Sequence, residues 1–252
     1  MSVQLELFSK EELEDITQVE NITPKNKGAE ITKNEIEVIK IGRNIARGFY
    51  RKYHYSKGCS NNAMSYGVYH VVTRELLGCV SFQVPCSENV RASILGEAYK
   101  SNVAELGRLA IKYGVYITAS MFVPIVIKVY VKEREARGME PVYALVSYAD
   151  SAQGHYGGVY QAMSWIYTGI SPTSKAFYRD STGRVRHPRQ NTKNISKEEA
   201  KTRGWEVISK TGVKYRYIKI ISGSKRFKKN LLKRSRYKGL PYPKPAVSSD
   251  LI

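Results

Sequence analysis

A histidine surrounded by glycines is the first group in the chain with evident chemical potential. His155 stands in the stretch GHYGG, with Gly154 before it and Gly157 and Gly158 close behind. Glycine permits a sharp backbone turn, and the free amides at the start of a helix favour an anion and a neutral imidazole. We expect His155 to contact a ligand and the three glycines to line a cofactor site. The alternative is that the histidine belongs only to a cap or a turn.

Three further side chains join the candidate catalytic set. His54 lies between Tyr53 and Tyr55, and it is either structural or catalytic together with Tyr55. Asp150 ends an apolar run, the position at which open α/β sheets hold ligand-binding side chains. Its alternative role is to cap the next helix. His54, Asp150 and His155 would also supply a facial triad for a metal ion if they converged.

Arg108 is a cation inside an otherwise apolar strand, ELGRLAI. A guanidinium is costly to bury without an anionic partner. Glu105, three residues earlier, points to the opposite face of a regular strand, so it is a poor partner. We expect Arg108 to meet a substrate phosphate or Asp150, the alternative being an internal ion pair.

A mixed set of strands and helices must position these side chains. Periodicity and turn residues predict a helix from residue 36 to about 53, followed by a hairpin of strands 66–72 and 76–82. A strand over 103–111, a helix from about 118 and a strand over 141–150 come next. The order ends with a short helix that has Val159, Ala162, Met163 and Ile166 inward, and a return strand over 164–169. Thus the sequence predicts an α/β (α+β) protein with a central mixed sheet flanked by helices.

Positive charge is concentrated in the last third of the chain. The 252 residues carry a formal net charge of +19, and residues 171–252 hold 22 Lys and Arg against 5 Asp and Glu. A polyanion is the expected partner. Nucleic acid is favoured over a membrane surface because the excess extends over residues 175–219 as well as the run 224–239. That run mixes apolar with basic residues, so one face should dock on the protein; the alternative is a solvated basic helix.

We expect three parts: an acidic N-terminal arm (residues 1–37), a catalytic core (38–170) and a basic nucleic-acid-binding extension (171–252). In the extension, alternation around residues 210–212 predicts a β-hairpin with one basic face, followed by a helix. Three cysteines without CxxC spacing predict reduced thiols rather than disulfides or a zinc site. No secretory leader and no uninterrupted apolar span is evident, which predicts a soluble, cytoplasmic protein with no membrane partner.

The order of elements over residues 103–169 resembles the core of the GNAT acyltransferase fold. More closely, KYHYS (52–56), ELGRLAI (105–111), ALVSYADSAQGHYGGVYQAMSWIYTG (144–169) and LPYPKP (240–245) resemble the phage Mom family. The resemblance implies a GNAT-like sheet. It also implies an enzyme that converts adenine in phage DNA to carbamoylmethyladenine and so protects that DNA from host restriction.

The resemblance also implies roles for individual residues. The target adenine would be flipped out of double-stranded DNA and stacked on Tyr53, Tyr55, Tyr66 or Trp165. In GNAT enzymes a tyrosine of the corresponding helix protonates the leaving group, and a glycine-rich loop holds the donor's pyrophosphate. Carried over to this chain, Tyr160 is the proton donor, Thr118 and Ser120 replace the loop, Arg108 binds charge on the donor, and His54 or Asp150 accepts the proton.

The donor stays open at this point. Either an acyl-CoA acylates the base and an amination follows, or a glycyl donor, which could be RNA-linked, acylates it and the adduct rearranges. Two other functions compete: a non-catalytic nucleic-acid-binding protein, for which the basic third suffices, and a GNAT enzyme that acts on RNA, protein or a small amine. The sequence does not indicate the oligomeric state.

Overall fold

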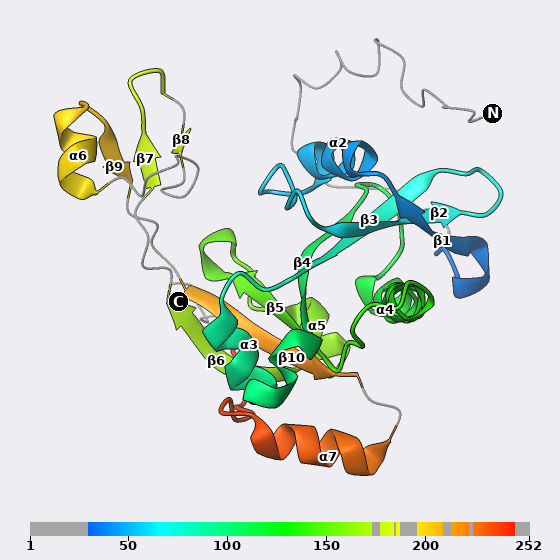
Figure 1. Ribbon diagram of the computed structural model, residues 1–252. Helices are drawn as coiled ribbons and strands as arrows, with labels where there is room; N and C mark the ends of the chain where they lie inside the picture. Colours follow the sequence, from blue (N-terminus) through cyan, green and yellow to red (C-terminus); the bar gives the residue numbers. More distant parts are fainter. Residues whose placement is uncertain are drawn as a thin grey trace, which may run out of the picture. The chain divides into compact units, whose positions relative to one another are not determined.

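The computed structural model describes residues 30–172, 177–183, 185–186, 196–208, 213–221 and 224–244. Most of the expected acidic arm, residues 1–29, lies outside the described residues. In chain order the elements are η2 (Lys33–Glu35), β1 (Ile36–Ile41), α2 (Arg43–Tyr53), β2 (Met64–His70), β3 (Leu76–Gln83), α3 (Glu88–Leu95), η3 (Glu97–Asn102), β4 (Val103–Ile111), α4 (Ala119–Ala136), β5 (Ala144–Asp150), η4 (Ser151–Gln153), α5 (Gly158–Ala162), β6 (Ile166–Pro172), β7 (Phe177–Arg179), β8 (Val185–Arg186), α6 (Lys197–Thr202), β9 (Glu206–Ile208), β10 (Val213–Ile220) and α7 (Lys225–Arg234) (Figure 1).

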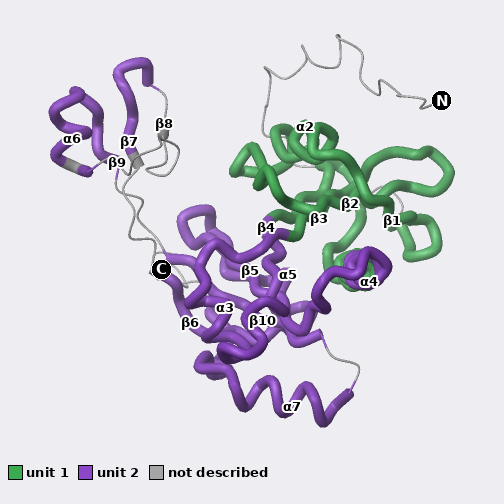
Figure 2. The backbone as a smooth tube through the Cα atoms, in the orientation of Figure 1, with its two compact units in different colours: residues 1–82, 108–129 green, residues 83–107, 130–252 purple. Residues whose placement is uncertain are grey.

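The strands form two sheets. The larger has seven strands in the order β1-β2-β3-β4-β5-β10-β6, and the smaller has three in the order β8-β7-β9. The larger sheet is mixed, because β4 and β5 run parallel while β5, β10 and β6 run antiparallel. The expected mixed sheet flanked by helices is therefore confirmed. The chain divides into two compact units, Met1–Phe82 with Arg108–Val129 and Gln83–Gly107 with Tyr130–Ile252 (Figure 2).

The first unit is built on the antiparallel strands β1, β2 and β3. The hairpin of β2 and β3 is as predicted, but residues 36–41 form strand β1 rather than the start of a helix. Their β-branched side chains suit a pleated sheet better than a helix. Helix α2 packs its apolar side on this sheet, in a core of Ile41, Ala46, Phe49, Tyr50, Cys79 and Ala110.

In the second unit, strand β10 lies between β5 and β6 and is antiparallel to both. The predicted β-hairpin of the basic extension is therefore wrong, since β9 pairs with β7 instead of β10. The alternation of tyrosines with basic residues suggested one solvated face. In the structure Tyr217 is fully buried and Arg216 is only 8% exposed, because the ring of Tyr160 packs against Tyr217 and the ring of Tyr237 covers the Arg216 guanidinium.

Helices α3 and α7 cover one face of the sheet in the second unit (Figure 1). Leu231 of α7 is buried among Ile94 and Leu95 of α3 and Val146 and Ile218 of the sheet. Phe227, Leu232 and Tyr237 pack around this cluster. The apolar side of the basic run therefore docks on the protein, as predicted, and its lysines and arginines remain exposed.

Helix α5 is shorter than the sequence suggested. It ends at Ala162, and Ser164 then adopts a positive φ of 56°. Val159 and Ala162 are consequently exposed, so the predicted inward face is wrong for them, whereas Met163 is buried. In the described part of the chain no helix is both long and apolar enough to cross a membrane.

Candidate active site

Strands β4 and β5 part after a short parallel ladder. Their pairing runs from Val103 opposite Ala144 to Glu105 opposite Val146 and then ends, although β5 continues to Asp150. Beyond Glu105, β4 no longer pairs with β5, and the Leu106 carbonyl accepts from the Ser147 side chain instead.

A tyrosine and a serine meet where the ladder ends. Ser147 Oγ lies 2.7 Å from the carbonyl oxygen of Leu106 and 2.6 Å from the phenolic oxygen of Tyr160. A carbonyl can only accept, and a serine hydroxyl has one proton. Ser147 is the donor in both contacts, so it shares its proton between the Leu106 carbonyl and the Tyr160 phenolic oxygen. The Tyr160 oxygen is thus held in place as an acceptor, and the Tyr160 proton is not used in this contact.

Aromatic packing fixes the ring of Tyr160. Its centroid lies 5.2 Å from that of Trp165 and 5.1 Å from that of Tyr217. Tyr217 donates a hydrogen bond of 2.5 Å to the carbonyl oxygen of Tyr156, and Gln161 Nε2 donates to the Tyr217 hydroxyl at 3.1 Å. Burial raises the pKa of Tyr217, which keeps this phenol protonated as a donor. The rings of Trp165, just before β6, and of Tyr217 in β10 thus hold the Tyr160 hydroxyl at the parting of the strands.

A different local feature accounts for each glycine near His155. Gly154 ends η4 in the left-handed conformation. Gly157 has a φ of 85°, and a Cβ there would overlap the ring of Tyr217, so only glycine fits. Nothing lies within 4 Å of a Cβ placed on Gly158. Packing therefore explains Gly157, and cofactor contact by the three glycines stays a prediction.

His155 and Asp150 occupy the turn between β5 and α5. The His155 amide donates to the Asp150 carbonyl oxygen at 3.2 Å, and the His155 side chain is exposed. The carboxylate of Asp150 is buried and accepts from the amide of Ala152 at 3.1 Å, which caps η4. Of the two roles open to Asp150, the structure shows the capping role.

His54 caps the C-terminus of α2 in the first unit. Its Nδ1 accepts a hydrogen bond from the amide of Ser56 at 3.0 Å, and Ser56 Oγ lies 2.9 Å from the same nitrogen. An amide can only donate, so Nδ1 carries no proton and neutral His54 holds its proton on Nε2. The ring of Tyr55 stacks on the imidazole, with centroids 4.4 Å apart.

Arg108 is tied to the loop that follows His54. Its Nε donates to the carbonyl oxygen of Gly58 at 2.9 Å, and its charge acts on the nearby Cys59 thiol. Burial nevertheless raises the pKa of Cys59. The structure thus places Arg108 beside the KYHYS segment, in one unit. That Arg108 meets a substrate phosphate or Asp150 stays a prediction.

The remaining predicted residues have mixed outcomes. Thr118 and Ser120 are exposed at the start of α4, where Ser120 Oγ donates to Thr118 Oγ1 at 3.3 Å. Tyr66 and Trp165 are fully buried, so they cannot offer a face to a base, whereas Tyr53 and Tyr55 remain accessible.

No three His, Cys, Asp or Glu side chains gather anywhere in the described ranges, so the facial triad of His54, Asp150 and His155 is not formed.

Two residues of this region were not predicted from the sequence. Ser147 looked like one polar residue in an apolar run, and only its contact with Tyr160 gives it a role. Arg216 lies 3.5 Å from the centroid of Tyr237 and donates twice to Thr168, through Nε to Oγ1 and through Nη2 to the carbonyl oxygen. No local pattern could reveal either contact, since the partners are far apart in the chain.

Comparison with known proteins gives one family and several remote structural likenesses. Residues 35–244 match the family described as the Mom protein family. No curated protein sequence matches the chain. Among solved structures, the spermidine N-acetyltransferase from Vibrio cholerae in complex with CoA and spermine is 8% identical, with a TM-score of 0.40 over 75% of this chain and 96% of that one. The IAA acetyltransferase from Bacillus cereus is 9% identical, with a TM-score of 0.38 over 74% and 99%.

Proposed function

This chain belongs to the Mom protein family, and on that premise we propose that it is a transferase that modifies DNA. In this proposal it transfers an acyl-type group to the exocyclic amine of adenine, as the first step toward a carbamoylmethyladenine-type base. The modified base protects phage DNA from host restriction enzymes.

The observation that supports the proposal best is the Tyr160 hydroxyl at the point where β4 and β5 part. Acyl transfer to an amine requires a proton for the departing group, and a tyrosine positioned by hydrogen bonds can supply it. Ser147 and the Leu106 carbonyl orient the phenol, and Trp165 and Tyr217 restrain its ring.

Protons and electrons balance with the residues available. The amine nitrogen of adenine forms a bond to the acyl carbon of the donor, the bond to the leaving group breaks, and Tyr160 protonates that group. The attacking nitrogen loses one proton. Because His54 already holds its proton on Nε2 and Ser56 occupies Nδ1, we assign proton acceptance to Asp150, whose carboxylate has a second oxygen besides the one bound by Ala152.

The residues at the parted strands fit an acyl donor. Main-chain groups of β4 beyond Glu105 no longer pair with β5. In addition, Trp165 Nε1 is a buried donor for which the described residues provide no hydrogen-bond acceptor. A bound donor supplies the activated carbonyl, and Tyr160, which is half-buried, would lie beside it. Acyl-CoA and a glycyl donor both remain compatible with these groups.

The basic side of α7 supports DNA as the substrate. Its apolar side chains pack in the core of the second unit, and its cations are exposed; among them, Arg234 also lies over the ring of Tyr99, 5.4 Å from its centroid. Exposed lysines and arginines on one helix side bind phosphates and release counterions, which gives affinity without sequence preference. The exposed residues are Lys225, Arg226, Lys228, Lys229, Lys233 and Arg234.

Nucleoside mass spectrometry tests this function. DNA from cells that express the protein is digested to nucleosides and compared with DNA from cells that lack it. The proposal requires a heavier deoxyadenosine species, and unshifted deoxyadenosine in the presence of folded protein would refute it. Turnover of an acyl donor without DNA, with a small amine or RNA as acceptor, would favour the competing acyltransferase functions instead.

A further inference from the structure

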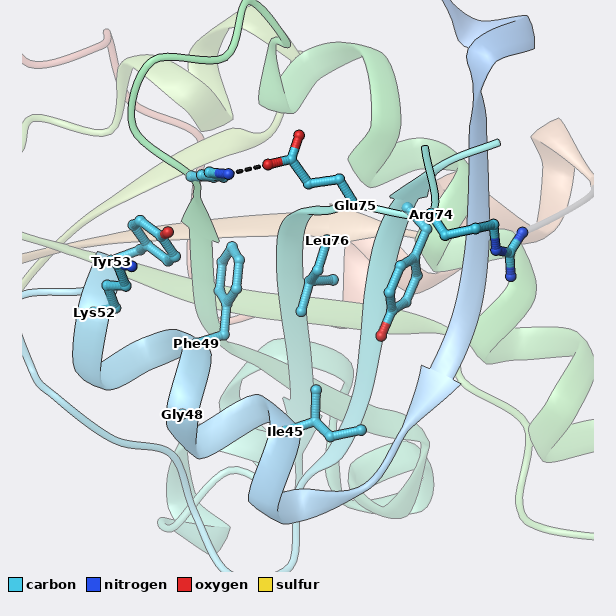
Figure 3. Close-up of a pocket in the computed structure, with 10 residues that line it drawn as sticks. Ile45, Gly48, Phe49, Lys52, Tyr53, Arg74, Glu75 and Leu76 are labelled. Carbon is cyan, nitrogen blue, oxygen red and sulfur yellow. Dashed lines mark hydrogen bonds and ion pairs between the residues drawn. The ribbon is translucent and has the colours of Figure 1, made fainter. Parts of the chain in front are cut away.

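A hollow in the first unit has Tyr53 as the one lining residue that was considered above as a site residue. Its volume is about 300 Å³, and its ten lining residues come from α2, β2, β3, their connecting turn and the residue after β4 (Figure 3). We call it the α2 hollow, and its lining residues are Ile45, Gly48, Phe49, Lys52, Tyr53, Tyr69, Arg74, Glu75, Leu76 and Lys112.

The inner surface of the α2 hollow is mainly apolar and aromatic. Figure 3 shows Ile45 and Phe49 rising from α2 toward Leu76 of the sheet, with Tyr53 one turn further along the helix. The centroids of Phe49 and Tyr53 lie 4.6 Å apart, and Tyr113 packs edge-on against Tyr53 at 5.4 Å. Such a surface suits a flat aromatic ligand, since stacking needs only a π-face and tolerates any base.

The rim of the α2 hollow is cationic. Lys52, Arg74 and Lys112 contribute three positive charges, and Glu75 is the one carboxylate among the lining residues. Glu75 forms an ion pair with Lys112, and Arg74 pairs with Glu37 at 2.5 Å. Lys52 Nζ lies 5.6 Å from the centroid of Tyr53, beside the aromatic wall. An aromatic surface next to a lysine matches a base that is joined to a phosphate.

Gly48 keeps the α2 hollow open. It stands in the middle of α2, where glycine is a poor residue. Nothing lies within 4 Å of a Cβ placed on it, so neither packing nor backbone conformation requires glycine there. A side chain at this position would instead take up space in the hollow, of which Gly48 is a lining residue.

From these features we propose that the α2 hollow binds one unstacked nucleotide of the DNA substrate, with its base on Tyr53 and its phosphate at Lys52. This inference rests on the proposed action on DNA and names where the displaced base is held. Tyr53 directly precedes His54 and Tyr55, so the base would lie next to these two residues. The loop that follows them contains Gly58, whose carbonyl oxygen accepts from Arg108.

The test compares binding of the full chain to two labelled duplexes, one fully paired and one with a single bulged adenine. Stacking of one base contributes enough free energy that the bulged duplex should bind at least about tenfold more tightly. Gly48→Leu should reduce this preference to about twofold or less while affinity for the paired duplex stays unchanged. Asn44→Leu adds the same side chain at an exposed position of α2 outside the hollow and should keep the preference.

A second variant guards against misfolding. If Gly48→Leu unfolds, Lys52→Ala, which removes an exposed rim cation, should still lower the preference about threefold or more. An equal affinity of the wild type for both duplexes, or a preference that survives Gly48→Leu, would overturn the proposal. A third result would also overturn it: Gly48→Leu keeps the preference for the bulged duplex but no longer binds adenosine 3′,5′-bisphosphate. In that case the hollow would hold the donor instead of the DNA base. Unmodified cellular DNA with an intact bulge preference would refute the proposed chemistry and leave the hollow in place.

Discussion

The phenolic oxygen of Tyr160 lies 2.6 Å from Ser147 Oγ, where strands β4 and β5 separate. Ser147 donates its one proton to both the Leu106 carbonyl and the Tyr160 oxygen, so the Tyr160 proton is not used in this contact. Ser147 of β5 thus holds the proton donor Tyr160 at the point where β4 and β5 separate. This relationship connects the fold to the proposed chemistry.

Tyr160→Phe should lower the rate of DNA modification about 100-fold, because it removes a positioned acid and little else. Tyr156→Phe, on the same segment, is the matched control and should keep nearly full activity. The measurement is the yield of modified deoxyadenosine per unit time, with circular dichroism to show that both variants are folded. Equal loss in both would contradict a specific role for Tyr160.

Gly157→Ala should destabilise the protein by about 2 kcal/mol or more, because an added methyl group meets the ring of Tyr217 at a positive φ. Gly154→Ala is the control: it also has a positive φ, of 68°, but open space around it, so it should cost only about 1 kcal/mol. Urea denaturation measures both values. Similar costs for the two variants would show that contact with Tyr217 is unimportant.

Stability should fall above pH 9 because of Cys79. Burial raises the pKa of Cys79 from its ordinary value of 9.0 to about 12. The folded state therefore keeps a proton that the unfolded state loses, so the stabilisation is complete below pH 9 and declines as the pH rises toward 12.

The decline is expected to reach about 1.4 kcal/mol per pH unit from this group. Unfolding free energies between pH 8 and about 10.5 measure it. Cys79→Ala should make the decline shallower, whereas Cys86→Ala, at an exposed cysteine, should leave it unchanged. A pH dependence that is the same in all three proteins would contradict the assignment.

Neutralising Lys228 and Lys229 together should weaken binding to duplex DNA and lower the salt slope by about two ions, because each exposed lysine is expected to release one counterion. Binding titrations at several salt concentrations measure the slope. Neutralising Lys128 and Lys132, both exposed on α4, provides the comparison and should change it little. An unchanged slope in the α7 variant would remove that helix from the DNA contact.

Local sequence pattern was enough for elements whose neighbours are near in the chain. The run 103–111 became β4 with the bounds expected, and the hairpin of β2 and β3 formed where short β-rich runs flank a turn. Both strand inferences depend on a repeat that is visible within about ten residues. Tyr160, in contrast, could be named only because the resemblance to GNAT enzymes implies a proton-donating tyrosine in the helix after the central strand.

What the sequence did not reveal depends on distant partners. Residues 36–41 fit a helical stripe, yet pairing with β2 makes them a strand. Strand β10 reads as half of a hairpin until β5 and β6 cover its two edges. The fit of Gly157 against Tyr217 joins residues 60 positions apart, and a glycine that serves packing looks the same in sequence as one that binds a cofactor.

The most direct test of the account compares deoxyadenosine in DNA from cells that express the wild type or Tyr160→Phe at equal levels. The account predicts a heavier deoxyadenosine species with the wild type and almost none with the variant. Unshifted deoxyadenosine with the wild type, or an equal amount of the heavier species with both proteins, would contradict it.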